Sequence, residues 1–570
     1  MAEPSSKKLK ADTPVVLHPG LVNMTADERR EIKDIVLSNA PFPHYQIPAL
    51  CTPEHMLKVH TECVEELQST FKETDLFKLY QTIDLANLKL SDPLATKLPA
   101  LMQLRNALVD ICCVSIPSHG VLQYTTAFRS LIADIMGCGP LTDKVDCAAN
   151  VYMSGCHLLP HDDVIGTRCI SYVIYLSDPE DEWKAEDGGA LELFPAAEPG
   201  IPALVPTTFV LPSYNTLALF RVEPGVSFHS VQEVYADKPR LSIQGWFHQE
   251  SAPDGVEQAT QRQLAAMAAT VAPFDPLSNA DDDDEDDLST DDIDYLKTFI
   301  NDIYLSAPTI AQIQRAFQQT GSLQLQDFLI PAWADAIAAA TRRDDATDHL
   351  GHGHVPAYTA GYGPDWAPQG PLYHQRYLRF VGPGASSPSA AASSGALLGT
   401  VQSDLVRSDA FSKWLAAVSG VGLSGVRSEV RRFRAGLDYT LAHAPDADHA
   451  ILDAVVCFCD PGKTRHGDAA AGDDDAQSTW QTGFECYMAA KDDGVGDVAA
   501  DDDENGVQIE AQHNTLSLVV RDTHTIKFVK FISAREPGSR WDVHAEFCLA
   551  AVAAADDDDD DKGDEGDEAA

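Results

Sequence analysis

The chain has 570 residues, of which 44% are hydrophobic, and a formal net charge of −46 at pH 7. This length predicts two to four domains, and the apolar content is sufficient for globular cores. No apolar run approaches the roughly 18 residues that span a bilayer, and the N-terminal residues lack the apolar segment of a secretory signal, so we expect neither a membrane partner nor secretion.

Charge and cysteine usage narrow the class further. Acidic runs at 281–287, 473–475, 501–504 and 556–561 are typical of solubilising segments, or of a lure for a basic partner such as a ribosomal protein. The same charge disfavours strong direct binding of nucleic acid, because phosphates would be repelled. Twelve cysteines occur without any CxxC pair, which indicates reduced core thiols in a nuclear or cytosolic protein. The basic cluster at 7–10 is compatible with a nuclear address or with a solvated tail.

The elements follow in chain order. Residues 1–30 are predicted to be a disordered basic tail, and helices are expected from Thr52-Pro53 and over 98–111. From about residue 150, short β-rich runs separated by Gly, Pro and Asp predict an antiparallel sandwich or barrel. We place a first domain at 31–250, a helical and acidic linker at 251–290, a second domain at 291–555 and an acidic tail at 556–570. Within the second domain, helical residues 291–321 end at Gly321 and precede a second β-rich block at about 430–549.

The two β-rich blocks resemble each other. NTLALFRVEPGVSF from Asn215 parallels NTLSLVVRDTHTIK from Asn514, PRLSIQGWF parallels SRWDVHAEF, and GGALELF parallels TGFECYM. Because these motifs recur in the same order, the sequence indicates a duplicated β-domain.

A metal site is predicted in the first block. His161 and Asp163 form an H-x-D pair just before the strand-like run ISYVIYL, and His229 follows in VSFHSVQEV. Two histidines and one carboxylate bind one face of Fe(II) and leave open the positions that O₂ activation requires. Each residue alone has a simpler explanation, a chance pair or a core histidine, and only their joint occurrence favours iron.

An anion site is predicted beside the metal. Arg240 and Ser242 lie two residues apart in a strand and therefore share a face, and an arginine fork can hold the far carboxylate of a 2-oxo diacid. Tyr175 and Tyr152 are positioned to add phenolic hydrogen bonds. Taken singly, Arg240 is equally compatible with a surface arginine and Tyr175 with strand packing.

The run HDD…ISYVIYL…GGALELF…NTLALF…VSFHSVQEV…RLSIQGWFH resembles the prolyl 3-hydroxylase family of 2-oxoglutarate- and iron-dependent oxygenases that act on a small-subunit ribosomal protein. The resemblance covers nearly the whole chain. It implies a mainly β fold with flanking α-helices, built of two double-stranded β-helix (jelly-roll) domains of which the second is degenerate. It also implies that His161, Asp163 and His229 bind Fe(II), that Arg240, Tyr152, Tyr175 and Ser242 bind 2-oxoglutarate, and that O₂ is the cosubstrate. Ascorbate is expected to rescue iron oxidised without substrate. The implied substrate is a decoding-centre protein, so translation accuracy and termination would be affected, in the nucleus and cytoplasm.

The second block lacks a complete metal set in the sequence. Alignment without gaps places Phe528 at the position of His229, and His443 and Pro445 at those of His161 and Asp163. Arg540 matches Arg240, but Asp542 replaces Ser242 and would spoil an anion site. We therefore predict an iron-free second domain that serves as scaffold or docking module.

Two other functions remain open at this point. One is an adaptor that binds translation-termination or mRNA factors, although a pure scaffold has no need of the metal residues. The other is the same chemistry on another basic protein or on nucleic acid.

Overall fold

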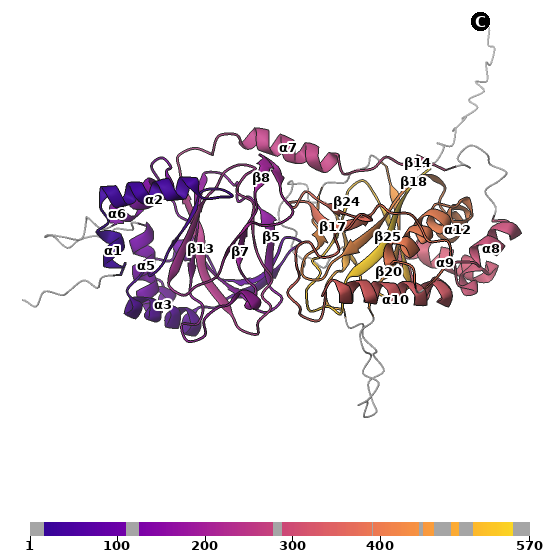
Figure 1. Cartoon of the computed structure of the whole chain (residues 1–570), viewed down its shortest axis with the longest axis horizontal. Helices are drawn as coiled ribbons and strands as arrows, with labels where there is room; N and C mark the ends of the chain where they lie inside the picture. The colour runs from indigo at the N-terminus through magenta and orange to yellow at the C-terminus, as the bar shows by residue number, and fades with distance from the viewer. Residues whose placement is uncertain are drawn as a thin grey trace, which may run out of the picture.

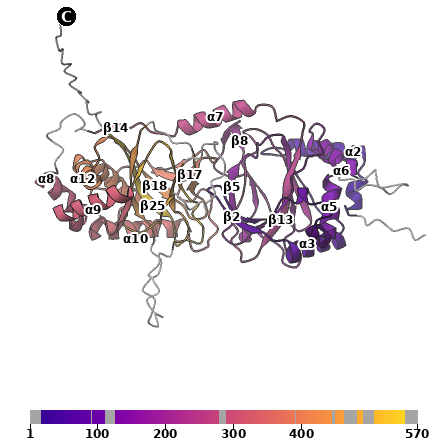
Figure 2. The same ribbon diagram turned by 180° about the vertical axis from the view of Figure 1, so that it is seen from behind.

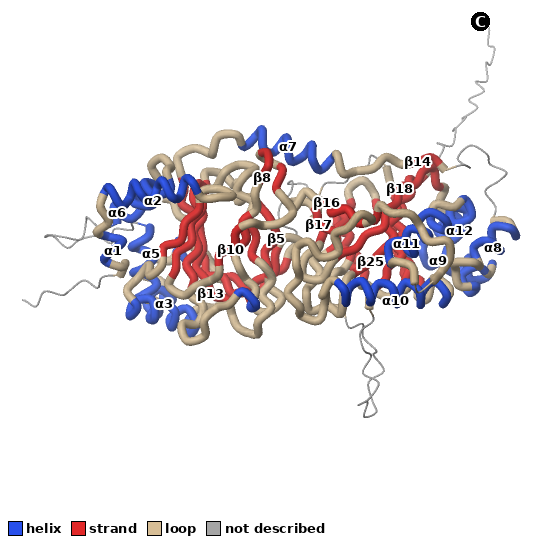
Figure 3. Tube along the Cα trace, viewed as in Figure 1, coloured by secondary structure: helices blue, strands red, loops and turns tan. Residues whose placement is uncertain are grey.

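The computed structural model describes residues 16–89, 91–109, 125–277, 288–389, 391–443, 449–460, 480–489 and 506–550. Two β-rich units lie side by side, with helices gathered at the two outer ends of the molecule (Figures 1 and 2). Helix α7 bridges the junction between the units (Figure 1). The tube view separates the strands into two groups that face each other across this junction (Figure 3).

The described helices fall into two groups, one for each β-rich unit. Those up to and including the bridging helix are α1 (Pro19–Val22), α2 (Ala26–Ser38), α3 (Pro53–Glu66), η1 (Leu85–Asn87), α4 (Pro93–Lys97), α5 (Pro99–Val109), α6 (Thr125–Met136), η2 (Ala185–Asp187) and α7 (Val256–Ala268). Those of the second unit are α8 (Thr290–Leu296), η3 (Asp302–Leu305), α9 (Ala307–Thr320), α10 (Pro331–Thr347), α11 (Ser394–Thr400), η4 (Val401–Val406) and α12 (Asp409–Ser419).

The first unit is one curled antiparallel sheet that folds over on itself. Its strands are β1 (His44–Ile47), β2 (Thr70–Glu73), β3 (Phe77–Gln81), β4 (Ala148–Tyr152), β5 (His157–His161), β6 (Arg168–Tyr175), β7 (Leu191–Leu193), β10 (Thr208–Val210), β11 (Thr216–Arg221), β12 (His229–Val231) and β13 (Arg240–His248). Their order is β1-β11-β6-β13-β4-β3-β5-β12-β7-β10, with β2 beside β3, and a small separate ribbon pairs β8 (Ala196–Glu198) with β9 (Ile201–Pro202).

The second unit repeats this plan with two sheets. Its strands are β14 (Asp275–Pro276), β15 (Ser322–Leu325), β16 (Trp366–Gln369), β17 (Gln375–Phe380), β18 (Leu423–Phe433), β19 (Tyr439–Thr440), β20 (Ile451–Phe458), β21 (Glu485–Ala489), β22 (Val507–Ile509), β23 (Thr515–Arg521), β24 (Thr525–Val529) and β25 (Arg540–Leu549). The larger sheet has the order β15-β23-β20-β25-β18-β17-β16, and the smaller has β22-β21-β24.

The central strands of the larger sheets are buried on both faces. Seven of the eight residues of β6 and all eight of β20 are buried, because one face packs on the outer helices and the other faces the barrel interior. Such strands appear in the sequence as continuous apolar runs rather than alternating ones. The mainly β fold of two double-stranded β-helix units with flanking helices is therefore confirmed.

The duplication includes the helices. Asn215 and Asn514 both adopt positive φ, 57° and 54°. The side chain of Asn215 pairs with the backbone of Cys51, and that of Asn514 pairs with the backbone of Leu329 in the same way. Each of these partners lies two residues before the proline that starts a helix, α3 or α10.

The units contact each other through their smaller strands. Leu159 of the first unit packs with Leu441 and Phe531 of the second. The buried carboxylate of Glu233 accepts hydrogen bonds from the Ser533 hydroxyl and, at 2.9 Å, from the Ala534 amide. Leu159 lies on β5, two residues before His161, and Glu233 lies four residues after His229, so these contacts are close in the chain to the predicted metal residues.

One boundary differs from the prediction. The tail expected over 1–30 is wrong for residues 16–30, because Leu17 and Leu21 are buried in the first core and α2 begins at Ala26, with Thr25 and Glu28 forming a reciprocal cap. Residues 1–15 lie outside the described residues. The sequence pattern around Leu17 and Leu21 did not predict that these two side chains are buried. The acidic tail 556–570 lies outside the described residues.

Within the described part of the chain, no helix is both long and apolar enough to cross a membrane. The ten cysteines among the described residues are all free, and eight of them are buried.

Candidate iron and 2-oxoglutarate site

The three predicted metal residues converge in the first unit. His161 ends β5 and His229 begins β12, and the two are direct partners across these strands. Nε2 of His161 lies 3.2 Å from Oδ1 of Asp163, and Nε2 of His229 lies 3.3 Å from Oδ2. The candidate ligand atoms all lie within 4.8 Å of one another, which is the spacing that one shared ion requires. The His161 side chain is 22% exposed while the other two are 5% exposed, so the site is open on the His161 side.

Backbone carbonyls orient both imidazoles. Nδ1 of His161 lies 2.9 Å from the Leu159 carbonyl, and Nδ1 of His229 lies 2.8 Å from the Ser227 carbonyl. A carbonyl only accepts, so each Nδ1 carries the proton and each Nε2 keeps its lone pair for a metal.

Asp163 is held as an anion from several sides. Its φ of 62° turns the chain so that the carboxylate faces inward, and Trp246 on β13 donates to Oδ2 at 2.8 Å. Burial alone would raise the pKa of Asp163, but in the metal-free chain, where a proton can take the place of the metal on each Nε2, the charge of His229 and the hydrogen bonds from His161 and His229 outweigh burial and lower this pKa well below its usual range. A carboxylate held ionised in this way suits a divalent cation.

Asp162 has a different role from its neighbours. Its carboxylate accepts hydrogen bonds from the amides of Val164 and Gly225, at 3.3 and 3.2 Å, and from the side chain of Gln263 on α7 at 3.2 Å. It therefore caps the loop and does not join the metal set.

The predicted anion site adjoins the metal site inside the same barrel. Arg240 lies opposite Tyr152 on β4, and Ser242 lies opposite Tyr175 on β6. All four side chains are buried. The guanidinium carbon of Arg240 lies 4.9 Å from the Tyr152 ring centre and 5.2 Å from that of Tyr175, and its Nε donates to the Gly189 carbonyl at 2.6 Å.

Several buried polar groups around Arg240 have no hydrogen-bond partner. The hydroxyls of Tyr152 and Tyr175 and the amide of Asn150 are buried without a hydrogen-bond partner. Among the described residues no carboxylate forms an ion pair with Arg240. Buried polar groups are normally satisfied, so a cationic group surrounded by unpaired hydroxyls fits a bound carboxylate such as that of 2-oxoglutarate.

The comparisons with known proteins agree with this geometry. Residues 147–248 match the model of the 2OG-Fe(II) oxygenase superfamily, and residues 291–558 match "Oxoglutarate and iron-dependent oxygenase degradation C-term". The chain is 38% identical over 502 residues to prolyl 3,4-dihydroxylase OGFOD1 of Ostreococcus tauri, covering 85% of this chain and 91% of the relative. This chain belongs to the OGFOD1 family of 2-oxoglutarate- and iron-dependent oxygenases.

Two further matches extend the comparison. Prolyl 3-hydroxylase OGFOD1 of Xenopus laevis is 27% identical over 531 residues, covering 88% of this chain and 84% of the relative. A solved structure, a Pseudomonas putida prolyl-4-hydroxylase, aligns with a TM-score of 0.26 and 20% identity over 39% of this chain and 100% of that chain.

The second barrel of this oxygenase keeps the frame of the first but not its metal residues. Gly483 and Arg540 repeat the contact of Gly189 with Arg240, since each arginine donates to the carbonyl of its glycine. The sequence alignment placed Phe528 at the position of His229, and the strand pairing shows that this was wrong. His229 lies opposite Leu193 on the neighbouring strand. In the second barrel, Tyr487 is the counterpart of Leu193, and the residue opposite Tyr487 is Lys527. A one-residue difference in the preceding connection displaces the alignment. Lysine therefore replaces the second histidine of the metal set.

His443 retains the setting of His161. Its Nδ1 lies 3.2 Å from the Leu441 carbonyl, as that of His161 does from the Leu159 carbonyl, and its ring packs edge-on against His374. Pro445, the counterpart of Asp163, lies outside the described residues.

The second barrel also neutralises its arginine internally. Arg540 pairs with Glu485 and Asp542 at 3.3 and 3.1 Å, so its anion position is filled by the chain. A cluster of Asp453, His544 and Glu546 has metal-like spacing. Its carboxylates, however, are paired with other side chains, Asp453 with Lys527 and Arg521, and Glu546 with Arg521 and Arg427.

Sequence reasoning missed two residues of the first site. Trp246 is part of the RLSIQGWFH motif but showed no sign of reaching Asp163. Asn150 lies two residues before Tyr152 and opposite Ser242, so strand periodicity would have placed it on the pocket face.

Proposed function

We propose that this oxygenase hydroxylates a prolyl residue of a basic small-subunit ribosomal protein and so affects translation accuracy and termination. Three features support the proposal: the names of its relatives, prolyl 3-hydroxylase and prolyl 3,4-dihydroxylase, the sequence resemblance, and the net charge of −46, which favours a basic protein loop over nucleic acid. The observation that carries the oxygenase chemistry is the convergence of His161, Asp163 and His229 in the same barrel as the buried Arg240, which forms no ion pair with any described residue.

The chain's own residues would divide the work as follows. His161, Asp163 and His229 would hold Fe(II), with Leu159 and Ser227 fixing the imidazoles and Trp246 fixing the carboxylate. Arg240, Ser242, Tyr152 and Tyr175 would hold the distal carboxylate of 2-oxoglutarate. When bound, iron and 2-oxoglutarate supply the oxidising power that inserts one atom of O₂ into a C–H bond of the substrate. The protein supplies the position of each group and buries the side chains that would hold 2-oxoglutarate.

The test uses the full chain with Fe(II), 2-oxoglutarate, O₂ and proline-containing peptides from a small-subunit ribosomal protein. We expect a peptide mass gain of about 16 Da for one hydroxyl or about 32 Da for two, with succinate formed in step. The two masses also distinguish the activities named in the two relatives.

His161→Ala is expected to abolish this mass gain and to lower Fe(II) affinity. His354→Ala, which alters an exposed histidine of the second unit, is the matched control and should leave both unchanged. Full hydroxylation by the His161→Ala enzyme would refute the site. Succinate formation without any peptide product would leave the oxygenase chemistry intact and refute the substrate.

Ascorbate is proposed to sustain turnover by reducing iron that has been oxidised without substrate. Progress curves with and without ascorbate test this, and identical curves over many turnovers would contradict it. The nuclear and cytoplasmic location is likewise a proposal, which rests on the cysteines without a disulfide pattern and, for the nucleus, on the 7–10 basic cluster. Imaging a chain that lacks the cluster tests the nuclear part.

A further inference from the structure

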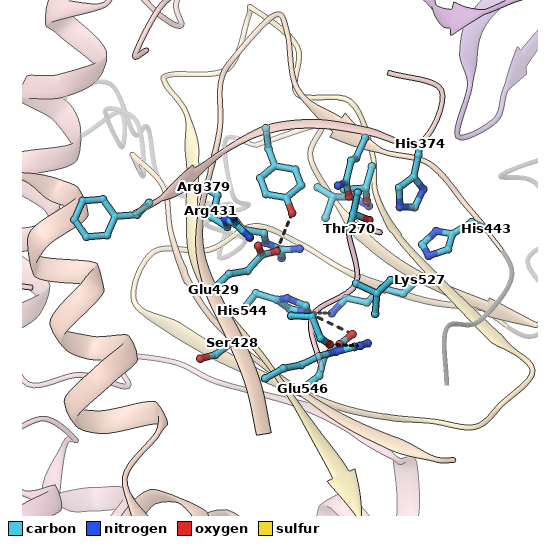
Figure 4. A pocket seen from close by; sticks show the side chains of 18 of the residues that line it. Thr270, His374, Arg379, Ser428, Glu429, Arg431, His443, Lys527, His544 and Glu546 are labelled. Carbon is cyan, nitrogen blue, oxygen red and sulfur yellow. Dashed lines mark hydrogen bonds and ion pairs between the residues drawn. The ribbon is translucent and has the colours of Figure 1, made fainter. Parts of the chain in front are cut away.

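A cavity of about 390 Å³ opens in the second barrel (Figure 4). Strands β17, β18, β24 and β25 supply most of its lining, and residues 270–272, which directly follow α7, close one side. The volume is within the range of pockets that bind small molecules, roughly 300–1,000 Å³. Since Lys527 on β24 occupies the place of His229, this cavity corresponds to the metal side of the first barrel.

Cationic side chains dominate the lining. Five belong to arginine or lysine, namely Arg379, Arg427, Arg431, Arg521 and Lys527, whereas two are carboxylates, Glu429 and Glu546. The whole chain has the opposite balance, 41 basic against 87 acidic residues. Cationic side chains that lie this close together repel one another, so we expect carboxylates beside them.

Most of this charge is compensated by carboxylates in or under the lining. Arg431 makes a bidentate pair with Asp542, at 2.8 and 3.1 Å. Lys527 lies 3.1 Å from Asp453 and 3.0 Å from Glu485. The remaining pairs join Arg521 to Asp453 and Glu546, and Arg427 to Glu546.

Arg379 is the exception. Its half-buried side chain forms no ion pair or hydrogen bond with any residue that the structure describes. The carboxylate of Glu429 is near enough to attract Arg379 electrostatically, but its hydrogen bond, at 2.9 Å, comes from the Tyr377 hydroxyl (Figure 4). The five cations of the lining and Arg540 beneath it make six positive side chains. The carboxylates around them number five, namely Glu429 and Glu546 in the lining and Asp453, Glu485 and Asp542 beneath it. Among the described residues, the cavity lining and the carboxylates beneath it thus include one more cationic than anionic side chain, and Arg379 is the cation that contacts no carboxylate.

We propose that this second-barrel cavity binds a small molecule that carries one oxyanion group, a carboxylate or a phosphate, with Arg379 as its principal contact. A guanidinium presents a planar fork that matches both groups. Gln375, Ser428 and Thr440 line the same cavity and offer amide and hydroxyl groups to the remainder of the ligand. This cavity is not the second-barrel equivalent of the proposed 2-oxoglutarate site. Arg540, the counterpart of Arg240, is already paired with Glu485 and Asp542 and is not the proposed contact.

The test measures binding of two probes to the full-length protein, trifluoroacetate by ¹⁹F NMR and inorganic phosphate by ³¹P NMR. All samples carry Arg240→Ala, so that the anion site of the first barrel does not contribute. We expect saturable line broadening with one or both probes, and the preferred probe distinguishes a carboxylate from a phosphate ligand. Arg379→Gln should weaken the binding at least about tenfold, the effect of losing one charged hydrogen-bonded contact.

Two comparisons complete the experiment. Arg315→Gln, which removes an exposed arginine on α9, should leave the binding unchanged, and Arg379→Lys, which keeps the charge but loses the fork, should give an intermediate affinity. Equal binding before and after Arg379→Gln would overturn the proposal. The proposal would also be overturned if neither probe bound saturably to the Arg240→Ala protein although its unfolding temperature equalled that of the unsubstituted chain. Neither outcome depends on turnover, so this test and that of the hydroxylase are independent.

Discussion

The ring of Tyr373, in the second unit, stacks on the ring of Phe228, the residue before His229, with ring centres 5.6 Å apart and planes 23° from parallel. The Tyr373 hydroxyl also lies 3.3 Å from the carbonyl of Gln263, whose side chain donates to Asp162 between the other two metal residues. One side chain of the second barrel thus braces both segments that carry the proposed iron ligands of the first barrel.

Removing this brace should loosen the metal site. We expect Tyr373→Ala to lower Fe(II) affinity by about tenfold, the lower end of the range for groups that orient ligands from behind, and Tyr373→Phe, which keeps the stacked ring, to have a smaller effect. Fe(II) titration measures this directly. Tyr295→Ala on the outer helix α8 is the control, and equal losses in all three variants would contradict a positioning role.

Trp246→Phe tests the hydrogen bond to Asp163. The phenyl ring keeps the apolar surface under Arg168, whose guanidinium carbon lies 3.5 Å from the Trp246 ring centre, but it removes the N–H donor. Fe(II) affinity is expected to fall between about tenfold and a hundredfold, with little change in unfolding temperature. An unchanged affinity would show that the other contacts of Asp163 suffice to hold it.

Gly189→Ala tests the support of Arg240. This glycine has a φ of 66°, and an added Cβ would lie 2.9 Å from Cδ of Arg240, so the arginine must move. We expect the KM for 2-oxoglutarate to rise more than kcat falls. Gly353→Ala provides the control, because this glycine also has positive φ but open space around it. A similar KM change in both variants would point to backbone strain instead of a displaced arginine.

Glu233 should make stability depend on pH. Burial raises its pKa from an ordinary value of 4.5 to about 7, so the folded protein retains a proton that the unfolded chain loses. The free energy of unfolding should therefore fall as the pH rises from about 4.5 to about 7 and stay level above it, by roughly 3 kcal/mol for this group. Glu233→Gln should be as stable as the parent near pH 4 and more stable near pH 8 in denaturant titrations. Parallel stability curves across this range would rule out the assigned protonation.

Lys527→Met should destabilise the second barrel. The lysine neutralises the buried carboxylates of Asp453 and Glu485, and breaking a buried pair by removing one partner costs about 3–5 kcal/mol. Lys97→Met, which removes an exposed pair with Glu66, is the control and should have little effect. Comparable losses in the two variants would contradict the proposed burial penalty.

The sequence by itself determined the family, the duplicated β-fold and which side chains could meet at a metal. His161, Asp163, His229 and Arg240 could be chosen as candidates because iron and a carboxylate accept few residue types, and strand periodicity placed Arg240 and Ser242 on one face. The apolar runs of β6 and β20 similarly required strands covered on both sides.

Tertiary structure decided the contacts between distant segments. Trp246 reaching Asp163, Tyr373 bracing Phe228 and Lys527 in place of His229 depend on loop lengths and on strand register. A one-residue change in a connection moves every later side chain to another neighbour or to the opposite face. Local sequence patterns report the face on which a residue lies, but only the packed chain fixes which residue lies opposite, since that pairing is set by steric fit and electrostatic balance summed over the whole barrel.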